Sequence, residues 1–109
     1  MRLLVFGGTT EGRLLAERLA GLGHDVTVSV ATELGAEELA GIPGLTVLAG
    51  RRDGEEIRRL VRAFALCIDA THPYAAEVTK NIRAACGEEG IPLRRLLRAE
   101  SPAEGCVRV

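Results

Sequence analysis

Residues 3–12 read Leu3-Leu4-Val5-Phe6-Gly7-Gly8-Thr9-Thr10-Glu11-Gly12. The first four are continuously apolar, as expected for a strand that is buried on both faces of a parallel sheet. From residue 11 to residue 22, leucines recur at helical spacing opposite charged side chains, which predicts an amphipathic helix. The glycine-rich turn therefore joins a buried strand to a helix.

The remaining sequence repeats this alternation of strand and helix. Further strands are predicted at residues 26–30, 45–48, 66–68 and 93–97, and further helices at residues 32–39, 53–64 and 75–86. Asp53 followed by Glu56 is typical of a capping box, which would start the second of these helices. The pattern predicts the α/β class, with a Rossmann-like parallel sheet of about five strands, helices on both faces and right-handed crossovers.

Composition excludes several classes of protein. The chain has 109 residues, enough for one domain, and its 47% hydrophobic and 27% charged residues exclude intrinsic disorder. Lys and Arg (14) balance Asp and Glu (15), and only 3% of residues are aromatic, so a nucleic-acid or membrane partner is not expected. Cys67, Cys86 and Cys106 show neither a disulfide framework nor metal-ligand spacing, which favours the cytoplasm and no metal site.

The glycine turn matches most of the dinucleotide-binding pattern Gly-x-Gly-x-x-Gly. Gly7 and Gly12 hold the first and third positions, whereas Thr9 replaces the middle glycine. The following helix would direct backbone N–H groups at a pyrophosphate, and the Thr9 and Thr10 hydroxyls could donate further hydrogen bonds. The alternative is a plain structural turn. The residues expected to bind the pyrophosphate are Gly7, Gly8, Thr9, Thr10, Glu11 and Gly12.

The end of the second predicted strand carries no acidic residue. An Asp or Glu about 20 residues after the glycine turn normally accepts hydrogen bonds from the free ribose 2′-hydroxyl of NAD. Here Ser29 and Thr32 flank Val30-Ala31, which favours NADP. Arg51 and Arg52 could supply positive charge for a 2′-phosphate, or they could be a solvated surface pair.

A second polar cluster, Asp69-Ala70-Thr71-His72-Pro73-Tyr74, follows the fourth predicted strand. Open α/β sheets bind ligands at this carboxyl edge, and these side chains can form hydrogen bonds or transfer protons. The structural alternative is a helix start, with Thr71 as the cap and Pro73 in the first helical position. Arg94, Arg95 and Arg98 could bind an acidic ligand or could be solvated edge charge.

These motifs together resemble the precorrin-6x (precorrin-6A) reductase family of cobalamin biosynthesis. The resemblance rests on residues 6–12, 26–32, 69–75 and 90–92, of which Asp-Ala-Thr-His-Pro-Tyr-Ala at residues 69–75 is the most specific. It implies an NADPH-dependent oxidoreductase that reduces precorrin-6A, or cobalt-precorrin-6A, to precorrin-6B. It also implies a tetrapyrrole substrate held between two α/β halves, of which this chain resembles the amino-terminal one.

The resemblance assigns roles to the polar residues. Ser29, Thr32 and Arg51 would hold the adenosine phosphate, Asp69 would belong to the cofactor site, and Thr71, His72 and Tyr74 would be catalytic residues near the nicotinamide and the macrocycle. We expect residues 1–100 to form the NADP-binding domain and residues 101–109 to begin a connection or second domain not present in this chain.

Two alternative functions are left open. One is a non-catalytic NADP-binding module, which would work only with a partner chain. The other is a different NAD(P)-dependent oxidoreductase or epimerase of Rossmann fold. Many enzymes of that second kind use a Tyr-x-x-x-Lys pair, whereas Tyr74 is followed four residues later by Val78.

Overall fold

The computed structural model describes residues 1–72 and 75–96 of the chain. Strands and helices alternate along this part, as predicted. The elements are β1 (Arg2–Phe6), α1 (Thr10–Gly21), β2 (Asp25–Val30), α2 (Glu33–Leu39), β3 (Leu45–Ala49), α3 (Gly54–Val61), β4 (Leu66–Asp69), α4 (Ala76–Glu89) and β5 (Leu93–Arg95). The predictions for Tyr74, Arg98, Cys106 and residues 101–109 lie outside the described residues.

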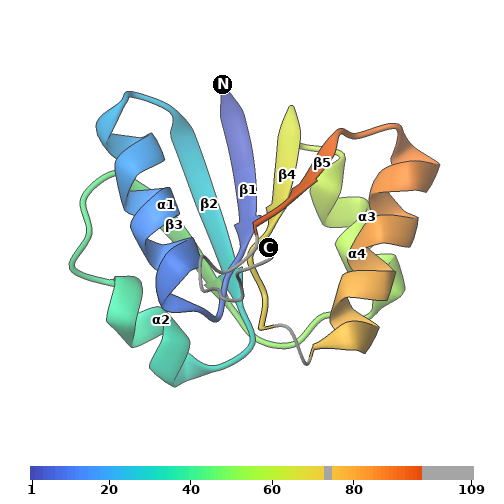
Figure 1. The fold of residues 1–109 in the computed structure, drawn as a ribbon, viewed down its shortest axis with the longest axis horizontal. Helices are drawn as coiled ribbons and strands as arrows, with labels where there is room; N and C mark the ends of the chain where they lie inside the picture. Colours follow the sequence, from blue (N-terminus) through green and yellow to red (C-terminus); the bar gives the residue numbers. More distant parts are fainter. Residues whose placement is uncertain (73–74, 97–109) are drawn as a thin grey trace, which may run out of the picture.

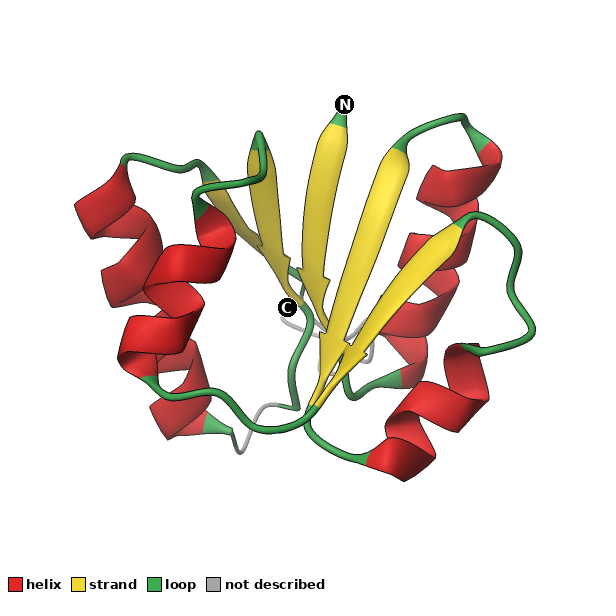
Figure 2. Cartoon of the chain, turned by 180° about the vertical axis from the view of Figure 1, so that it is seen from behind, coloured by secondary structure: helices red, strands yellow, loops and turns green. Residues whose placement is uncertain are grey.

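The five strands form one parallel sheet in the order β3-β2-β1-β4-β5. Helices α1 and α2 cover one face of the sheet, and α3 and α4 cover the other (Figures 1 and 2). The chain builds outward from β1 to β3 and then returns to place β4 on the other side of β1. The order therefore reverses between β1 and β4, and ligands bind beyond the strand ends at such a point. The predicted Rossmann-like class is confirmed.

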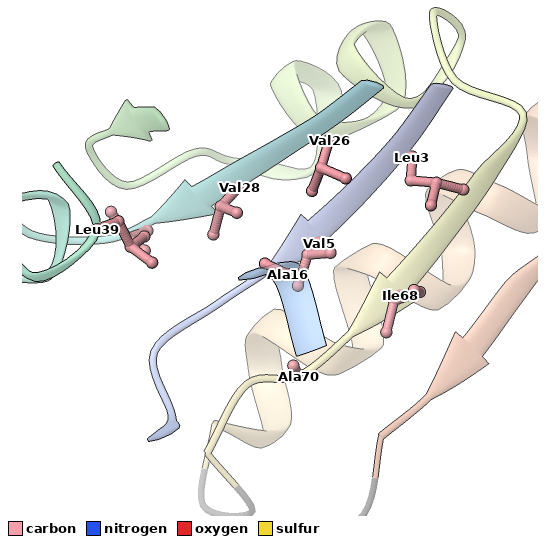
Figure 3. Packing of buried hydrophobic residues seen from close by; sticks show 9 residues of the cluster. Leu3, Val5, Ala16, Val26, Val28, Leu39, Ile68 and Ala70 are labelled. Carbon is pink, nitrogen blue, oxygen red and sulfur yellow. The ribbon is translucent and has the colours of Figure 1, made fainter. Parts of the chain in front are cut away.

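The core lies on both faces of the sheet because successive strand residues point to opposite sides. In β1, Leu3 and Val5 pack towards α1 and α2, whereas Leu4 and Phe6 pack towards α3 and α4. Figure 3 shows the first of these clusters, in which the side chains labelled are Leu3, Val5, Ala16, Val26, Val28, Leu39, Ile68 and Ala70. Since the valines of β2 face α1 and α2, Ser29 faces the opposite side, where α3 and α4 lie.

Helix ends follow local capping rules closely. The capping box of Asp53 and Glu56 is present at the start of α3, which confirms that prediction. Helix α4, predicted to extend to Cys86 and to close near Gly87 or Gly90, runs to Glu89 and closes at Gly90, whose φ of 70° is the left-handed conformation that glycine adopts without strain. Within the described residues, no helix is long and apolar enough to cross a membrane.

Candidate functional site

The three glycines of the turn after β1 have different structural roles. A Cβ atom at Gly7 would lie 3.0 Å from Val28 Cγ1, and a Cβ at Gly12 would lie 2.7 Å from Ala70 Cβ. Both glycines therefore allow close packing, of the turn on β2 and of α1 on the end of β4. Gly8 has a φ of 128° and a Cβ there would meet no protein atom within 4 Å. The space above Gly8 is open, as a site for a bound phosphate requires.

Thr9 ties this turn to the end of β4. Its hydroxyl accepts a hydrogen bond from Gly12 N (3.0 Å), which caps α1, and donates one to the carbonyl oxygen of Ala70 (2.8 Å). A hydroxyl has one proton, so the expectation that the Thr9 side chain donates to a phosphate does not fit this arrangement. Thr10 and Glu11 form the first turn of α1, where backbone N–H groups have no acceptor within the helix.

A cleft of about 270 Å³ lies at the carboxyl edge of the sheet. Its walls come from the segments after β1, β2, β3 and β4, together with α3 and the start of α4. Residues far apart in the sequence meet there because the carboxyl ends of the parallel strands lie at the same edge of the sheet. The cleft brings together the sequence-predicted residues Gly7, Gly8, Ser29, Arg51, Thr71 and His72.

The charged side chains that line this cleft are cationic. Arg51 and Arg52 both reach it from the segment after β3, and no Asp or Glu is among its described lining residues. Arg51 is exposed, whereas Arg52 is half-buried and its Nε atom is buried without a hydrogen-bond partner. A buried guanidinium N–H group is stabilised when it donates to an acceptor oxygen, so this end of the cleft suits a phosphate or a carboxylate.

Thr32 caps a helix and does not line the cleft. Its hydroxyl accepts a hydrogen bond from Gly35 N at 3.1 Å and so caps α2, and Thr32 is not among the residues that line the cleft. The Thr32 hydroxyl is therefore engaged at the start of α2, and its expected contact with the adenosine phosphate stays a prediction.

Asp69 is buried inside the protein and does not face the cleft. Its residue is 1% exposed, and its Oδ1 atom is paired with Arg95 and with the Thr71 hydroxyl. The Asp69 side chain is therefore engaged within the protein, and its expected contact with a cofactor stays a prediction. Arg95 likewise points inward at Asp69, so it is not presented to an acidic ligand, whereas Arg94 is exposed.

The segment after β4 is not a simple helix cap. Thr71 does not cap α4, because that helix begins at Ala76, with Ala75 in the cap position and no side-chain capping hydrogen bond. The prediction that Thr71 caps this helix, which belonged to the structural alternative, is therefore wrong. His72 is exposed at the cleft wall, and its carbonyl oxygen accepts a hydrogen bond from Ala75 N at 2.9 Å.

The described cysteines are inert. Cys67 and Cys86 lie in the core between the sheet and α4, and burial raises the pKa of both thiols, so neither forms a thiolate readily. No group of three His, Cys, Asp or Glu side chains that could hold a metal occurs in the part of the chain that the structure describes.

Arg52, which the sequence offered together with Arg51 as positive charge, also lines the cleft. Sequence reasoning missed one residue of this region. Thr79 contacts Thr71 from α4, with their hydroxyl oxygens 3.2 Å apart. The only available signal for Thr79 was a polar residue on an otherwise core-facing part of a helix, which is common and unspecific.

Comparison with known proteins identifies relatives along the whole chain. The family model described as Precorrin-6x reductase CbiJ/CobK matches residues 2–109. The cobalt-precorrin-6A reductase of Methanothermobacter thermautotrophicus is 34% identical over 112 residues, covering 100% of this chain and 37% of that protein. The precorrin-6A reductase of Rhodobacter capsulatus is 36% identical over 110 residues, covering 94% of this chain and 41% of that protein. The chain thus spans well under half the length of these relatives.

Solved structures agree with these sequence comparisons. A structure of CobK precorrin-6A reductase superposes with a TM-score of 0.76 and 34% identity, over 94% of this chain and 40% of that one. Vestitone reductase from alfalfa superposes with a TM-score of 0.68 at 16% identity, over 86% of this chain and 35% of that one. At this low identity the second likeness concerns the fold alone.

Proposed function

The chain belongs to the precorrin-6x reductase family, and from that premise we propose that it supplies the NADPH-binding half of a reductase. The proposed reaction is the reduction of precorrin-6A, or of cobalt-precorrin-6A, to precorrin-6B. The tetrapyrrole would lie between this domain and a second α/β domain or a partner chain.

The observation that carries this proposal is the lining of the cleft. An open turn at Gly8 and two arginines meet at one edge of the sheet, without a carboxylate among the described lining residues, and α1 begins two residues after Gly8. A dinucleotide with three phosphate groups matches this set of donors and charges. No acid stands at the end of β2, where a carboxylate would accept hydrogen bonds from a free ribose 2′-hydroxyl, and this favours NADP over NAD.

The chain's residues divide between the two ends of the cofactor. We assign the pyrophosphate to the turn from Gly7 to Gly12, and the 2′-phosphate to Ser29 with Arg51 and Arg52. The β4 side of the sheet then faces the nicotinamide, because a dinucleotide extends across the point where the strand order reverses. When bound, NADPH supplies a hydride to the substrate. Thr71 and His72 would orient the reacting ends and exclude water from them.

Titration calorimetry of this chain tests the proposal. We expect NADPH to bind at least about tenfold more tightly than NADH, because only NADPH carries the 2′-phosphate that the arginines would neutralise. Equal affinities would remove the basis for assigning NADPH, and absence of binding would contradict the cofactor role of this domain.

The alternative that the sequence left open is a non-catalytic NADP-binding module. A binding module would hold NADPH without turnover under any condition. The reductase proposal requires turnover once a second domain or partner closes the substrate site, so a reconstituted assay separates the two.

A further inference from the structure

A buried ion pair adjoins the part of the cleft wall that Thr71 and His72 form. Asp69 stands at the end of β4 and pairs in register with Arg95 of β5. The Asp69 Oδ1 atom lies 2.8 Å from Arg95 NH1, while Asp69 Oδ2 is buried without a hydrogen-bond partner. A carboxylate that is 1% exposed depends on such a partner, since an uncompensated buried charge is strongly destabilising.

The same pair holds the next residue of the cleft wall. Asp69 Oδ1 accepts hydrogen bonds from the backbone N–H of Thr71 at 3.0 Å and from its hydroxyl at 2.6 Å. Arg95 NH1 also donates to the Thr71 hydroxyl oxygen at 3.2 Å and to the carbonyl oxygen of Asp69 at 3.4 Å. The position of the Thr71 side chain is thus determined by groups on two neighbouring strands.

The hydrogen-bond directions around Thr71 can be assigned from its single hydroxyl proton. That proton goes to Asp69, since the carboxylate can only accept. The Thr79 hydroxyl, 3.2 Å away on α4, must therefore be the donor to Thr71. Thr71 receives hydrogen bonds from Arg95 and Thr79 and gives one to Asp69, so β4, β5 and α4 all contribute to one network.

We propose that Arg95 and Thr79 are positioning residues, which act through Asp69 and Thr71 to hold the Thr71–His72 wall in place for the nicotinamide half of the cofactor. This inference rests on the proposed function. A buried ion pair adds little net stability compared with apolar packing, whereas its directional hydrogen bonds restrict the geometry of the backbone that they bind. Neither positioning residue lines the cleft, so the effect on a ligand is transmitted through Thr71.

The test compares two ligands that occupy different lengths of the cleft. Adenosine 2′,5′-bisphosphate carries only the adenosine end, which we assign to the β2 and β3 side, whereas NADPH also reaches the β4 side. We expect Arg95→Met to weaken NADPH binding about tenfold and to leave adenosine 2′,5′-bisphosphate within about twofold of the unaltered chain, both measured by calorimetry. General damage to the domain would weaken both ligands together.

Arg94→Met is the matched control, because it removes the same charge from the neighbouring, exposed position of β5. Arg95→Lys, which keeps a cation beside Asp69, should recover most of the lost NADPH affinity. Thr79→Val is a milder second variant of nearly equal shape, which deletes the donor to Thr71 and should weaken NADPH several-fold even if Arg95→Met does not fold.

Three results would overturn the inference. Arg95→Met and Thr79→Val could both leave NADPH binding unchanged, or they could weaken the two ligands equally, which would indicate a purely structural network. Arg94→Met could also reproduce the effect of Arg95→Met. A different result would contradict the proposed function itself. In that case the unaltered chain would bind adenosine 2′,5′-bisphosphate and NADPH no more tightly than NADH.

Discussion

Gly8 combines a backbone conformation that favours glycine with open space where a side chain would project. Its φ of 128° disfavours any side chain, and the position of its Cβ is open to the cleft. By contrast, Gly12 is needed for packing, because a Cβ there would come within 2.7 Å of Ala70 Cβ. Substitution at Gly8 should therefore affect the ligand more than the fold.

We predict that Gly8→Val abolishes detectable NADPH binding by calorimetry while the domain stays folded. The positive φ should lower the free energy of unfolding by about 1 to 3 kcal/mol, which denaturant titration measures. Gly23→Val is the matched control, since Gly23 also has a positive φ, of 96°, and open space around its Cβ, but lies in the turn between α1 and β2. The control should be similarly destabilised and still bind. NADPH binding by Gly8→Val would move the phosphate site elsewhere.

The two arginines after β3 should contribute unequally to the choice of cofactor. Arg52 is half-buried at the cleft with an unpartnered Nε, whereas Arg51 is exposed and more fully hydrated. We predict that Arg52→Gln weakens NADPH binding by about tenfold, that Arg51→Gln has a smaller effect, and that neither changes NADH binding. Fluorescence or calorimetric titrations with both nucleotides measure this.

Arg18→Gln is the control for this pair, because it removes one exposed positive charge from α1. It should leave the affinities for both nucleotides unchanged. If Arg52→Gln lowered the NADH and NADPH affinities by the same factor, the Arg52 guanidinium would not be binding the 2′-phosphate.

At the scale of elements, α3 and α4 are joined by exposed ion pairs. Arg58 NH1 donates to Glu88 Oε1 at 3.0 Å, and Arg62 Nε donates to Glu89 Oε1 at 2.8 Å. These helices cover the sheet face on which the cleft opens, and α3 contributes Ile57 to its wall. The hydrogen bond from Arg62 lowers the pKa of Glu89 below its ordinary value of 4.5.

The direction of this pKa shift determines how stability depends on pH. A carboxyl group with a lowered pKa in the folded state stabilises the protein above its ordinary pKa, and this contribution is lost as the pH falls through the lowered value. We predict that Glu89→Gln is slightly less stable than the unaltered chain at neutral pH and equally stable in strongly acidic solution. Thermal unfolding at both pH values measures the difference.

Glu17→Gln, at an exposed position of α1, is the control for Glu89→Gln and should change stability little at either pH. High salt should also reduce the effect of Glu89→Gln at neutral pH, since the pair is exposed. A difference between Glu89→Gln and the unaltered chain that persisted in acid would indicate lost packing instead of a lost ion pair.

At the scale of the whole molecule, the cleft lies at the carboxyl edge of the sheet and is lined by the segments that follow β1, β2, β3 and β4. The chain covers 40% of the solved CobK precorrin-6A reductase that it resembles. The tetrapyrrole that we propose as substrate is wide and flat, so a wall formed by Thr71 and His72 would not by itself both hold it and exclude water from the path of the proposed hydride transfer. We propose that a second domain or partner completes the site.

We predict that this chain binds NADPH but does not oxidise it in the presence of precorrin-6A. A version extended to the length of the family relatives should do so. Absorbance of NADPH with purified substrate measures both reactions under the same conditions. Comparable rates from the two versions would show that one α/β half suffices for catalysis.

The sequence by itself determined the elements, their order and the location of the cleft. Each signal involved residues that are close along the chain: the capping box of Asp53 and Glu56, the glycine turn after β1, and the apolar stripes of the helices. Such signals act within one or two helical turns or one strand, so their physical basis is local. The alternation of strands and helices predicted a parallel sheet with right-handed crossovers, whereas the order of the strands in the sheet came from the structure.

Only the tertiary structure decided which polar side chains face the cleft and which serve the fold. Thr9 and Ala70 are 61 positions apart, and Arg95 and Asp69 are 26 apart, yet both pairs meet because β4 lies between β1 and β5. These contacts engage Thr9 and Asp69 within the protein. A side chain's burial and partners depend on which strands become neighbours, and no pattern within one segment contains that information.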